Sequence, residues 1–499
     1  MTVDTHKPPQ GTVRDWVDLR ADQCPDRVAY LFFDGVEPLR WEELRNRARV
    51  LAGQLTAQGA QKGESVAILH PNGREAIEWL YATLYGGFRA TVINLVAGDD
   101  AISYALEHSE ARFALVGPAQ QEMFDRVCPD GLTRLPVSGQ ADEIKLHPLA
   151  ADDDALLMYT SGTTGRPKGV VHSHASLLAG GWTPAVAHEL TSEDCGFCVL
   201  PIYHINGLCV TVMSTLITGG TLAVAEKFSA SRFWDQCEEA QATWFSVVPT
   251  IISHLLHSDL SPSPETRARL RFGRSASSAL APDVQTAFET RFEVPIVETM
   301  GLTETAAQIL SNPLPPGVRK IGSPGRAYGN EACILSPDLI PLPPYTQGEI
   351  AVRGPNVMRE YLKNPEATRG TFAPEGWLRT GDLGHVDEDG YFFVTGRLKE
   401  LIIKGGENIA PREIDEALYS HPDVIEAAAF ARPCASYGER VEAAVKLRNG
   451  SDLTPQQLIE ICVAKVGAFK SPDTVFVLED LPKGPSGKIQ RIKLPDVTR

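Results

Sequence analysis

Two hydrophobic periods alternate along the first third of the chain, and this alternation restricts the fold more than any other feature. Apolar residues at helical spacing predict a helix that includes Leu44 and Leu55 and ends at Gly59. A β-branched run at 66–69 then predicts a strand, 75–85 predicts a helix, and 90–95 predicts the next strand. Strand–helix–strand units of this length are typical of a largely parallel sheet with helices on its faces.

The same pattern returns in the middle of the chain and changes near residue 315. Segments 242–248, 272–274 and 295–297 predict strands, and 249–257 predicts a helix. Short apolar runs at 348–352 and 390–396 favour a small antiparallel β region. The chain then restarts as a compact unit, with helices predicted at 411–420 and 455–466 and strands at 425–431 and 442–447. We therefore place a domain boundary near residues 397–400.

Composition and charge exclude several classes of function. The chain has 47 basic and 63 acidic residues, a formal net charge of −16, and such a field repels nucleic acids and anionic membranes. Nine cysteines without framework spacing, Cys195 and Cys198 among them, favour buried thiols in a reducing compartment. No secretory leader and no run of about 18 apolar residues is visible. We therefore expect a cytoplasmic protein without an integral membrane segment.

A loop rich in glycine and hydroxyl side chains follows a predicted strand at 156–160. Glycines let backbone N–H groups turn toward phosphate oxygens, hydroxyls donate further hydrogen bonds, and a lysine adds a mobile positive charge. The spacing differs from the P-loop of ATPases, in which Gly-Lys-Ser/Thr leads directly into a helix. Composition alone leaves a ligand-free hairpin and a phosphate loop equally open. The loop contains Thr160, Ser161, Gly162, Thr163, Thr164, Gly165 and Lys168.

Six motifs in a fixed order favour the phosphate loop. They lie at 159–169, 300–304, 377–382, 396–400, 405–409 and 482–489. Together they resemble the signature motifs of the adenylate-forming superfamily, which includes acyl-CoA synthetases, peptide-synthetase adenylation domains and firefly luciferase. The resemblance runs from about residue 15 to the C-terminus. It implies a large multi-subdomain N-terminal α/β domain (1–396) with mostly parallel sheets and a small β region, a hinge (397–400), and a small mobile α+β C-terminal domain (401–499).

The resemblance also implies an activity. Members of the superfamily activate a carboxylic acid with ATP, release pyrophosphate and form acyl-AMP, and then pass the acyl group to a thiol. ATP and Mg²⁺ are therefore expected, with coenzyme A as co-substrate. Lys488 is the expected catalytic residue, because an ammonium between the carboxylate and the α-phosphate offsets the developing charge. Glu304 is the expected Mg²⁺ ligand, with Thr303 beside it, since carboxylate oxygens suit that ion.

Further residues are assigned to the nucleotide by the same resemblance. Asp382 is expected to accept hydrogen bonds from both ribose hydroxyls, because a carboxylate is an acceptor only. Arg397 is expected to reach the ribose or a phosphate. Met300 stands where the superfamily often has an aromatic residue, and a polarizable thioether can still cover an adenine face. The full set expected to bind ATP or AMP is Thr160, Ser161, Gly162, Thr163, Thr164, Gly165, Lys168, Ser275, Ala276, Ser277, Glu298, Thr299, Met300, Gly301, Asp382 and Arg397.

The acyl pocket is expected near residues 201–207. This segment resembles the one in which acyl-CoA synthetases carry an aromatic–histidine pair, and His204 is counted among the catalytic residues on that basis. Amino-acid-activating domains have an aspartate in this segment, so His204 argues against an α-amino acid. Walls that are apolar apart from one basic residue favour a hydrophobic carboxylic acid. The predicted walls are Tyr203, His204, Trp244, Ser246, Val248, Arg274 and Met300.

Coenzyme A is the expected acceptor. Gly405 and Gly406 leave room for pantetheine, and Tyr437 falls where some CoA ligases stack an aromatic ring on the CoA adenine. Glu407 and Lys470 complete the expected CoA-binding set, and Lys399 is the expected hinge residue. Two alternatives remain open: a stand-alone adenylating enzyme that loads an acyl carrier protein, and a non-catalytic nucleotide-binding paralogue. We also allow for a homodimer.

Overall fold

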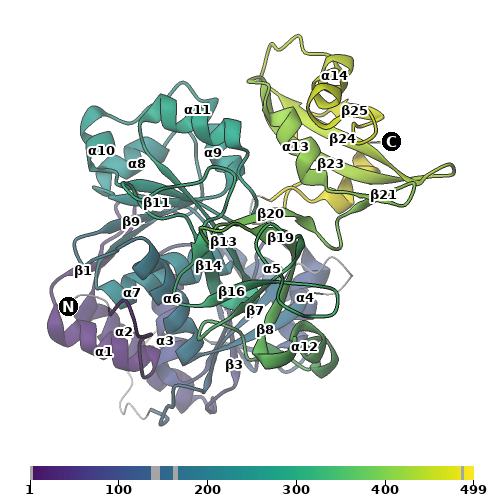
Figure 1. The fold of residues 1–499 in the computed structure, drawn as a ribbon. Helices are drawn as coiled ribbons and strands as arrows, with labels where there is room; N and C mark the ends of the chain where they lie inside the picture. The colour runs from purple at the N-terminus through teal and green to yellow at the C-terminus, as the bar shows by residue number, and fades with distance from the viewer. Residues whose placement is uncertain (1–3, 136–145, 161–166, 485–487, 499) are drawn as a thin grey trace.

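Two mostly parallel sheets form the centre of the large N-terminal part of the molecule (Figure 1). The computed structural model describes residues 4–135, 146–160, 167–484 and 488–498. The first sheet has the strand order β18-β8-β7-β4-β3-β5-β6. Its strands are β3 (Ser65–Leu69), β4 (Arg89–Val92), β5 (Phe113–Val116), β6 (Thr133–Arg134), β7 (Asp154–Thr160), β8 (Lys168–Ser173) and β18 (Glu360–Tyr361). All neighbours from β7 to β6 pair in parallel, whereas β8 and β18 are antiparallel additions at one edge.

The second sheet has the order β15-β14-β13-β12-β11-β9-β10-β1-β2. Neighbours from β13 to β1 pair in parallel, and β14, β15 and β2 are antiparallel at the edges. The strands are β1 (Val28–Leu31), β2 (Leu39–Arg40), β9 (Cys195–Cys198), β10 (Thr221–Val224), β11 (Trp244–Val247), β12 (Phe272–Ser275), β13 (Ile296–Leu302), β14 (Ala307–Ser311) and β15 (Arg326–Ala327). In such a sheet the carboxyl ends of the parallel strands meet at one edge, where ligand sites form.

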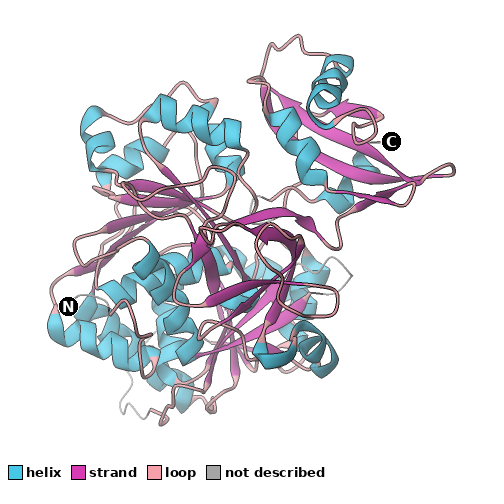
Figure 2. Ribbon diagram, viewed as in Figure 1, coloured by secondary structure: helices cyan, strands magenta, loops and turns pink. Residues whose placement is uncertain are grey.

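Helices lie against the faces of both sheets, as Figure 2 shows. Helix α3 illustrates why they form: Ile77, Leu80 and Leu84 are fully buried on it, and it ends at Gly87 in the left-handed conformation. The helices of the large part are α1 (Val13–Gln23), α2 (Trp41–Ala57), α3 (Arg74–Gly86), α4 (Asp99–His108), α5 (Gln121–Val127), α6 (His174–Ala187), a π-helical segment η2 (Asn206–Met213), α7 (Ser214–Thr218), α8 (Phe233–Glu239), α9 (Pro249–Leu256), α10 (Pro264–Arg269), α11 (Pro282–Phe292) and α12 (Pro365–Thr371).

A four-stranded antiparallel sheet follows, in the order β16-β17-β19-β20. Its strands are β16 (Glu331–Leu335), β17 (Gly348–Arg353), β19 (Leu378–Val386) and β20 (Phe392–Arg397). Its Ile334, Ile350 and Leu378 belong to a hydrophobic core that is shared with Val170 of β8 and Ile309 of β14. The β19–β20 register places Asp382 opposite Arg397.

The C-terminal unit stands beside the large part (Figure 1). Strands β21 (Ile402–Lys404), β22 (Glu407–Ile409), β23 (Val424–Cys434), β24 (Gly438–Leu447) and β25 (Thr474–Val477) form one sheet, with β25 beside β24. Helices α13 (Pro411–Tyr419) and α14 (Pro455–Val466) cover it, and a short helix α15 (Leu494–Val497) follows. Ile414, Leu418 and Val445 belong to its separate hydrophobic core. The unit contacts the large part at two places: α9 packs beside β23, and α13 packs beside β20 and α11.

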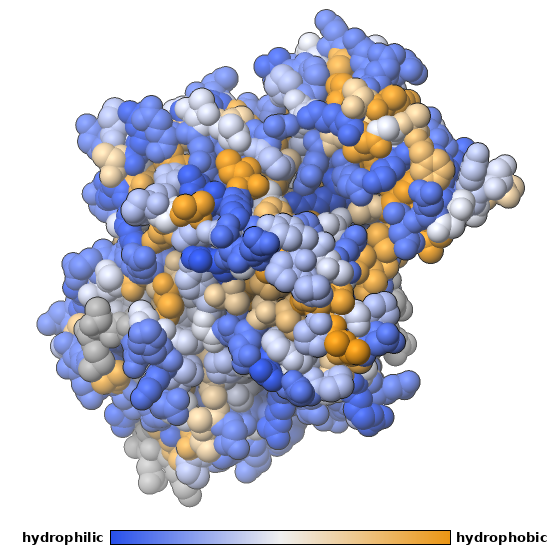
Figure 3. Space-filling model, in the orientation of Figure 1, coloured by the Kyte–Doolittle hydropathy of each residue, from blue (hydrophilic) through white to orange (hydrophobic). Residues whose placement is uncertain are grey.

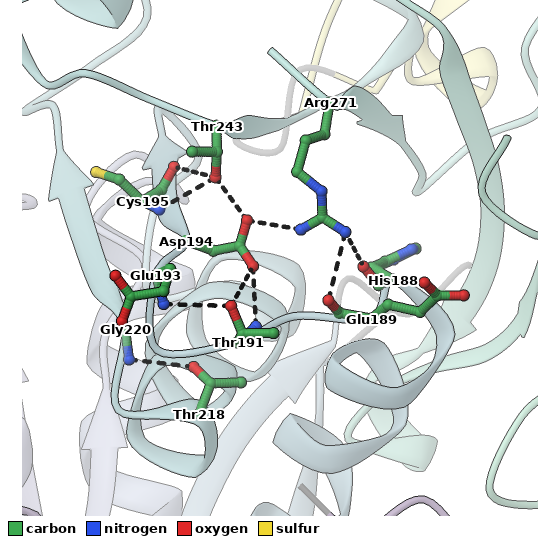
Figure 4. A network of polar contacts seen from close by, with 10 residues as sticks. All are labelled: His188, Glu189, Thr191, Glu193, Asp194, Cys195, Thr218, Gly220, Thr243 and Arg271. Atoms are coloured by element: carbon green, nitrogen blue, oxygen red, sulfur yellow. Dashed lines mark hydrogen bonds and ion pairs between the residues drawn. The ribbon is translucent and has the colours of Figure 1, made fainter. Parts of the chain in front are cut away.

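A polar network lies at the amino ends of strands β9, β11 and β12 of the second sheet and fixes the register of these strands (Figure 4). Asp194 accepts hydrogen bonds from Thr243 (2.8 Å) and from the Thr191 backbone (2.9 Å), and it pairs with Arg271 at 2.6 Å. Arg271 also donates to the carbonyl oxygens of His188 and Glu189, at 3.2 and 3.3 Å. These contacts join the starts of β9, β11 and β12. The other ends of the strands are thereby held in place for a site.

The predicted fold class is confirmed, with one large α/β part, a small β region and a small α+β unit. The two sheets are mixed only at their edges. No helix in the described parts of the chain is long and apolar enough to cross a membrane. All nine cysteines are free, and burial raises the pKa of the Cys195 thiol to about 12.

Candidate functional site

A cavity of about 670 Å³ lies between the large part and the C-terminal unit, at the carboxyl ends of β12 and β13. It gathers most of the residues that the sequence assigned to ATP and catalysis. From the large part, these lining residues are Thr160, Lys168, Ala276, Ser277, Glu298, Thr299, Met300, Gly301, Thr303, Glu304, Asp382, Arg397 and Lys399, and from the C-terminal unit Lys488. The structure therefore brings side chains more than 300 positions apart in the sequence into one site.

Glu304 lies on a short helical turn, Thr303–Thr305, that follows β13. Its carboxylate is held by Tyr361. The Tyr361 hydroxyl donates to Glu304 Oε1 at 2.7 Å. Lys168 Nζ sits 3.9 Å from the centre of the Tyr361 ring, and burial lowers the pKa of Lys168. No described basic residue forms an ion pair with Glu304. The second carboxylate oxygen thus fits a hard cation such as Mg²⁺, which uses one or two carboxylates together with substrate phosphates.

Asp382 and Arg397 form an ion pair across β19 and β20, with Nε–Oδ1 at 2.9 Å. Burial raises the pKa of Asp382, and the positive charges of Arg397 and Lys488 oppose that effect. The pKa of Arg397 is nevertheless raised overall, because Asp382 and Glu400 outweigh its burial. Asp382 therefore has a matched cation on one side, while its side chain still lines the cavity.

Lys488 reaches the same cavity from a hairpin of the C-terminal unit. Lys483 and Ile489 pair as a bridge, and Gly484 N donates to the Lys488 carbonyl oxygen at 2.7 Å. Burial and the neighbouring Arg397 lower the pKa of Lys488, whereas Glu400 and Asp382 oppose the shift. A buried ammonium beside few compensating charges is suited to an anion that enters the cavity.

The wall formed by residues 276–281 and by β13 is tightly constrained. Ser277 has a φ of +76°, a strained conformation for a residue with a side chain. A Cβ on Gly301 would lie 1.9 Å from the Ala307 carbonyl oxygen, so no larger residue fits there. Burial raises the pKa of Glu298, whose Oε2 has no partner among the described residues. Ser275, by contrast, lies behind this wall and does not line the cavity.

Arg274 also lines the cavity, and this residue is 1% exposed. Its nitrogens donate to neutral groups only: Nε to Gln308 Oε1 at 3.1 Å, and Nη1 to Asn206 Oδ1 at 2.7 Å and to Ser246 Oγ at 3.3 Å. Burial lowers its pKa to about 9, so the group stays charged at neutral pH. No carboxylate in the described part of the chain lies within 4.0 Å of it.

His204 also lines the cavity and is partly buried. Burial lowers its pKa to about 4, so the ring is neutral at neutral pH. Its Nε2 atom is buried and has no hydrogen-bond partner among the described residues. A neutral ring nitrogen in this position can donate to, or accept from, a ligand.

Several predicted residues lie outside the cavity. Trp244 and Ser246 share one face of the sheet with Phe272 and Arg274, to which they pair in register. Trp244 stacks on Phe272 in the core, with ring centroids 5.7 Å apart, and Arg274 bonds to Ser246 on the side of the cavity. The predicted walls that do not line the cavity are Tyr203, Trp244, Ser246 and Val248.

The residues predicted to bind coenzyme A lie on the outer edge of the C-terminal unit. Gly405 N donates to the Tyr437 carbonyl oxygen at 2.8 Å, and Lys470 pairs with Glu413. The set outside the cavity is Gly405, Gly406, Glu407, Tyr437 and Lys470. Ser161, Gly162, Thr163, Thr164 and Gly165 fall outside the described residues.

Three residues of the site were missed by the sequence analysis. Tyr361 precedes the N-cap of α12, and nothing in its neighbourhood signals chemistry. Asn206 opens the π-helical segment as one polar residue before an apolar run, which is a weak signal. Arg412, from α13, lines the cavity and donates to the carbonyl oxygens of Val394 and Gly322. No cluster of three or more metal-ligating side chains occurs among the described residues.

Comparisons with known proteins identify the family of the chain. The AMP-binding enzyme family matches residues 17–362, and its C-terminal domain family matches residues 413–488. Sulfoacetate–CoA ligase from Cupriavidus necator is 42% identical and covers 97% of each chain. Oxalate–CoA ligase from Arabidopsis thaliana is 36% identical and covers 94% of this chain and 95% of its own.

Among solved structures, MatB from Rhodopseudomonas palustris is 30% identical over 97% of this chain and 100% of its own. Its ATP-bound form matches with a TM-score of 0.88 and its apo form with 0.77. The predicted ATP-dependent activation of an acid and its transfer to coenzyme A are confirmed, and the identity of the acid is not fixed by these relatives. The chain therefore belongs to the AMP-binding enzyme family, as an acid–thiol ligase that forms an acyl-adenylate and then an acyl-CoA.

Proposed function

We propose that the acid activated by this ligase carries a second anionic group, which Arg274 binds. The observation that carries the proposal is a buried guanidinium at the cavity wall whose hydrogen-bond partners are all neutral. An unpaired buried charge is costly, and an anionic ligand group removes that cost when it binds. A guanidinium also presents a planar fork that matches carboxylate and sulfonate oxygens.

The named relatives support the same substrate class. Sulfoacetate has a carboxylate and a sulfonate, and oxalate has two carboxylates, so both ligases act on short acids with two negative charges. A hydrophobic acid, as the wall composition predicted, stays a prediction. Arg274 is the reason to prefer an anionic acid, because a purely apolar acyl chain leaves its charge without a partner.

We assign the first half-reaction to the residues that share the cavity. The Lys488 ammonium stabilises charge that develops as the acid carboxylate attacks the α-phosphate, and His204 orients that carboxylate through Nε2. Asp382 and Arg397 hold the ribose and Thr160 and Lys168 the phosphates. Mg²⁺, when bound by Glu304, neutralises phosphate charge. In the phosphate loop, Ser161, Gly162, Thr163, Thr164 and Gly165 are assigned to the phosphates by the resemblance alone.

The arrangement of the two parts fits the adenylation step. Lys488 lines the cavity, whereas Gly405 and Gly406 lie outside it, and the ATP-bound form of the relative is the better structural match. We propose that residues 397–400 act as a hinge about which residues 401–499 turn for thioester formation, with Lys399 at the pivot. Figure 3 shows apolar residues on the surface of the C-terminal unit, and Ile403, Tyr437 and Phe469 are 43–52% exposed there. This surface is available for the second arrangement.

A panel of acids in ATP–pyrophosphate exchange tests the proposed substrate class. We expect sulfoacetate, oxalate or malonate to support exchange at roughly 10² or more times the rate with acetate or propionate, because the monoacids leave Arg274 unpaired. Glycine, butyrate and benzoate complete the panel. Higher exchange with butyrate or benzoate would contradict the anionic class and support the hydrophobic one. Absence of Mg²⁺-dependent exchange with every acid would contradict the assignment of the site itself.

A second prediction concerns Tyr361. Tyr361→Phe removes the hydrogen bond to Glu304 and keeps the ring under Lys168. Loss of a group that orients a metal ligand typically costs about 10–100-fold in metal affinity. We therefore expect the Mg²⁺ concentration for half-maximal exchange to rise about tenfold, with little change in the rate at saturating Mg²⁺. Tyr345→Phe, at a tyrosine that is 65% exposed and does not line the cavity, is the control.

Acceptor and location complete the proposal. Coenzyme A is the acceptor, as in the named relatives, and loading of a carrier protein in addition stays a prediction that transfer assays test. Nine free cysteines fit a reducing compartment such as the cytoplasm. A homodimer stays a prediction.

A further inference from the structure

Glu426 joins the large part of the molecule to the C-terminal unit. It lies on β23, and its side chain is 0% exposed. Its Oε1 atom accepts hydrogen bonds from a histidine and from a lysine. His254 Nε2, on α9 of the large part, is 3.2 Å away, and Lys483 Nζ, on the C-terminal unit, is 2.7 Å away. Burial alone would raise the pKa of Glu426, but these two hydrogen bonds lower it overall, so the group is a carboxylate.

Lys483 belongs to the hairpin that presents Lys488. Besides the Lys483–Ile489 bridge and the bond from Gly484 N to the Lys488 carbonyl oxygen, Gln490 N donates to the Pro482 carbonyl oxygen at 2.8 Å. The base of the hairpin is therefore closed by backbone hydrogen bonds and tied to Glu426 by an ion pair. Lys483 is thus paired with Ile489, the residue next to Lys488.

Helix α9 holds the same end of β23 at two further points. The register of β23 on β24 shifts between Val424 and Glu426, so Ile425 is bulged out of the ladder. Its carbonyl oxygen accepts from Ser253 Oγ at 2.6 Å. His257 Nε2 lies 3.1 Å from the Pro422 carbonyl oxygen. Ser253 also lines the cavity, so this docking contact and the active site share one helix.

We propose that Glu426 is a positioning residue that couples docking of the C-terminal unit on α9 to the placement of Lys488. Docking brings His254 to the buried carboxylate, and the same carboxylate oxygen holds Lys483 at the base of the hairpin. Separation of the two parts removes His254, leaves Glu426 with Lys483 alone and opens the carboxylate to water. Glu426 is thus fixed from both sides, and Lys488 is placed for adenylation, only while the parts are docked. This inference rests on the catalytic role proposed for Lys488.

Glu426→Gln tests the coupling, because it keeps the shape of the side chain and removes its charge. With the panel acid that gives the highest wild-type exchange, we expect pyrophosphate exchange to fall roughly 10- to 100-fold, since misplacement by about 1 Å can cost about 10² in rate. Thioester formation from supplied acyl-AMP and coenzyme A is expected to stay within about twofold of wild type, because it does not need the charge of Lys488. Hydrogen exchange of α9 amides is expected to rise.

Glu442→Gln is the matched control. Glu442 is 1% exposed on the neighbouring strand β24 and has two cationic partners, Arg432 and Arg440, but both belong to the C-terminal unit. We expect this variant to change the thermal stability of the protein. The ratio of the rates of the two half-reactions and the hydrogen exchange of the α9 amides should stay unchanged. His254→Gln, at a side chain that is 35% exposed, removes the other half of the contact with little risk to folding. Its effect on pyrophosphate exchange should not add to that of Glu426→Gln.

An equal fall of both half-reactions in Glu426→Gln, or an unchanged exchange rate, would overturn the coupling. The Lys488→Ala variant distinguishes a failure of the Glu426 coupling from a failure of the proposed function. If Lys488→Ala does not selectively lower exchange, the catalytic assignment is wrong. If it does while Glu426→Gln and His254→Gln have no selective effect, only the coupling is wrong.

Discussion

Replacing Lys488 with alanine is expected to lower ATP–pyrophosphate exchange by about 10²–10³, the usual cost of losing one preorganised group that stabilises transition-state charge. Lys488 lines the cavity with Asp382, Arg397 and Glu304, so we expect its ammonium to lie near the phosphate that reacts. Thioester formation from supplied acyl-AMP is expected to continue, because the phosphoanhydride has then already formed. The two half-reactions are measured separately on the same preparation.

Two further variants make this result specific. Lys493→Ala removes an exposed lysine five positions along the same tail and should leave both half-reactions unchanged. Gly406→Leu should give the reverse of the Lys488 result, because Gly406 has a φ of +89° and lies outside the adenylation cavity, on the side assigned to pantetheine. A parallel loss of both half-reactions in Lys488→Ala, with a lowered melting temperature, would indicate damage to the fold.

The regular elements were predictable where local signals agree with packing. Helix α14 has the predicted bounds, because Thr454 caps it and Pro455 occupies its first position. Strand β13 was predicted only at 295–297, since Glu298 and Thr299 interrupt the apolar run; the strand continues to Leu302 because its register with β14 compensates. Strand β23 likewise extends to Cys434 through Arg432, which pairs across to β24. Pairing between strands extends elements that local hydrophobicity does not.

The motifs predicted residues that line the cavity, but not the contacts that depend on folding. Tyr361 meets Glu304 only because β18 pairs with β8, which lies almost 200 residues earlier in the chain. Trp244, one of the predicted acyl walls, lies outside the cavity for another reason: alternate residues of β11 face the same side, and Trp244 is deeper than Ser246 along that side. A strand pattern predicts which face a side chain takes, not how far along the strand the cavity begins.

The neighbours of Arg274 in the structure change the function that is inferred for this residue. From the sequence it was one basic residue among apolar walls. In the structure Asn206, Ser246 and Gln308 fix its guanidinium, and Gln308 Oε1 is itself shared with His188 Nε2 at 3.1 Å. Burial lowers the pKa of His188 to about 3, so this second ring is neutral and adds no charge of its own to the network. A fixed cation surrounded by neutral groups is suited to select an anion by charge.

Arg274→Met is therefore expected to change which acid is used. With a dianionic acid such as sulfoacetate we expect kcat/KM for exchange to fall by roughly 10³, because the variant leaves the second anion buried without a partner. With propionate it should rise or stay constant, because no unpaired guanidinium then remains in the cavity. The ratio of the two values thus measures the role of the charge. Arg274→Lys, which keeps a point charge without the fork, should fall between them.

Arg271→Met is the matched control for this change. Arg271 lies just before β12 in the network around Asp194, outside the cavity (Figure 4). Its loss should lower the melting temperature and leave the preference between acids unchanged. Binding gives a readout without catalysis: sulfoacetate should raise the melting temperature of the wild type and not that of Arg274→Met. If Arg274→Met lowered exchange equally with both acids, Arg274 would be a structural residue. The second anionic group would then have to be bound elsewhere.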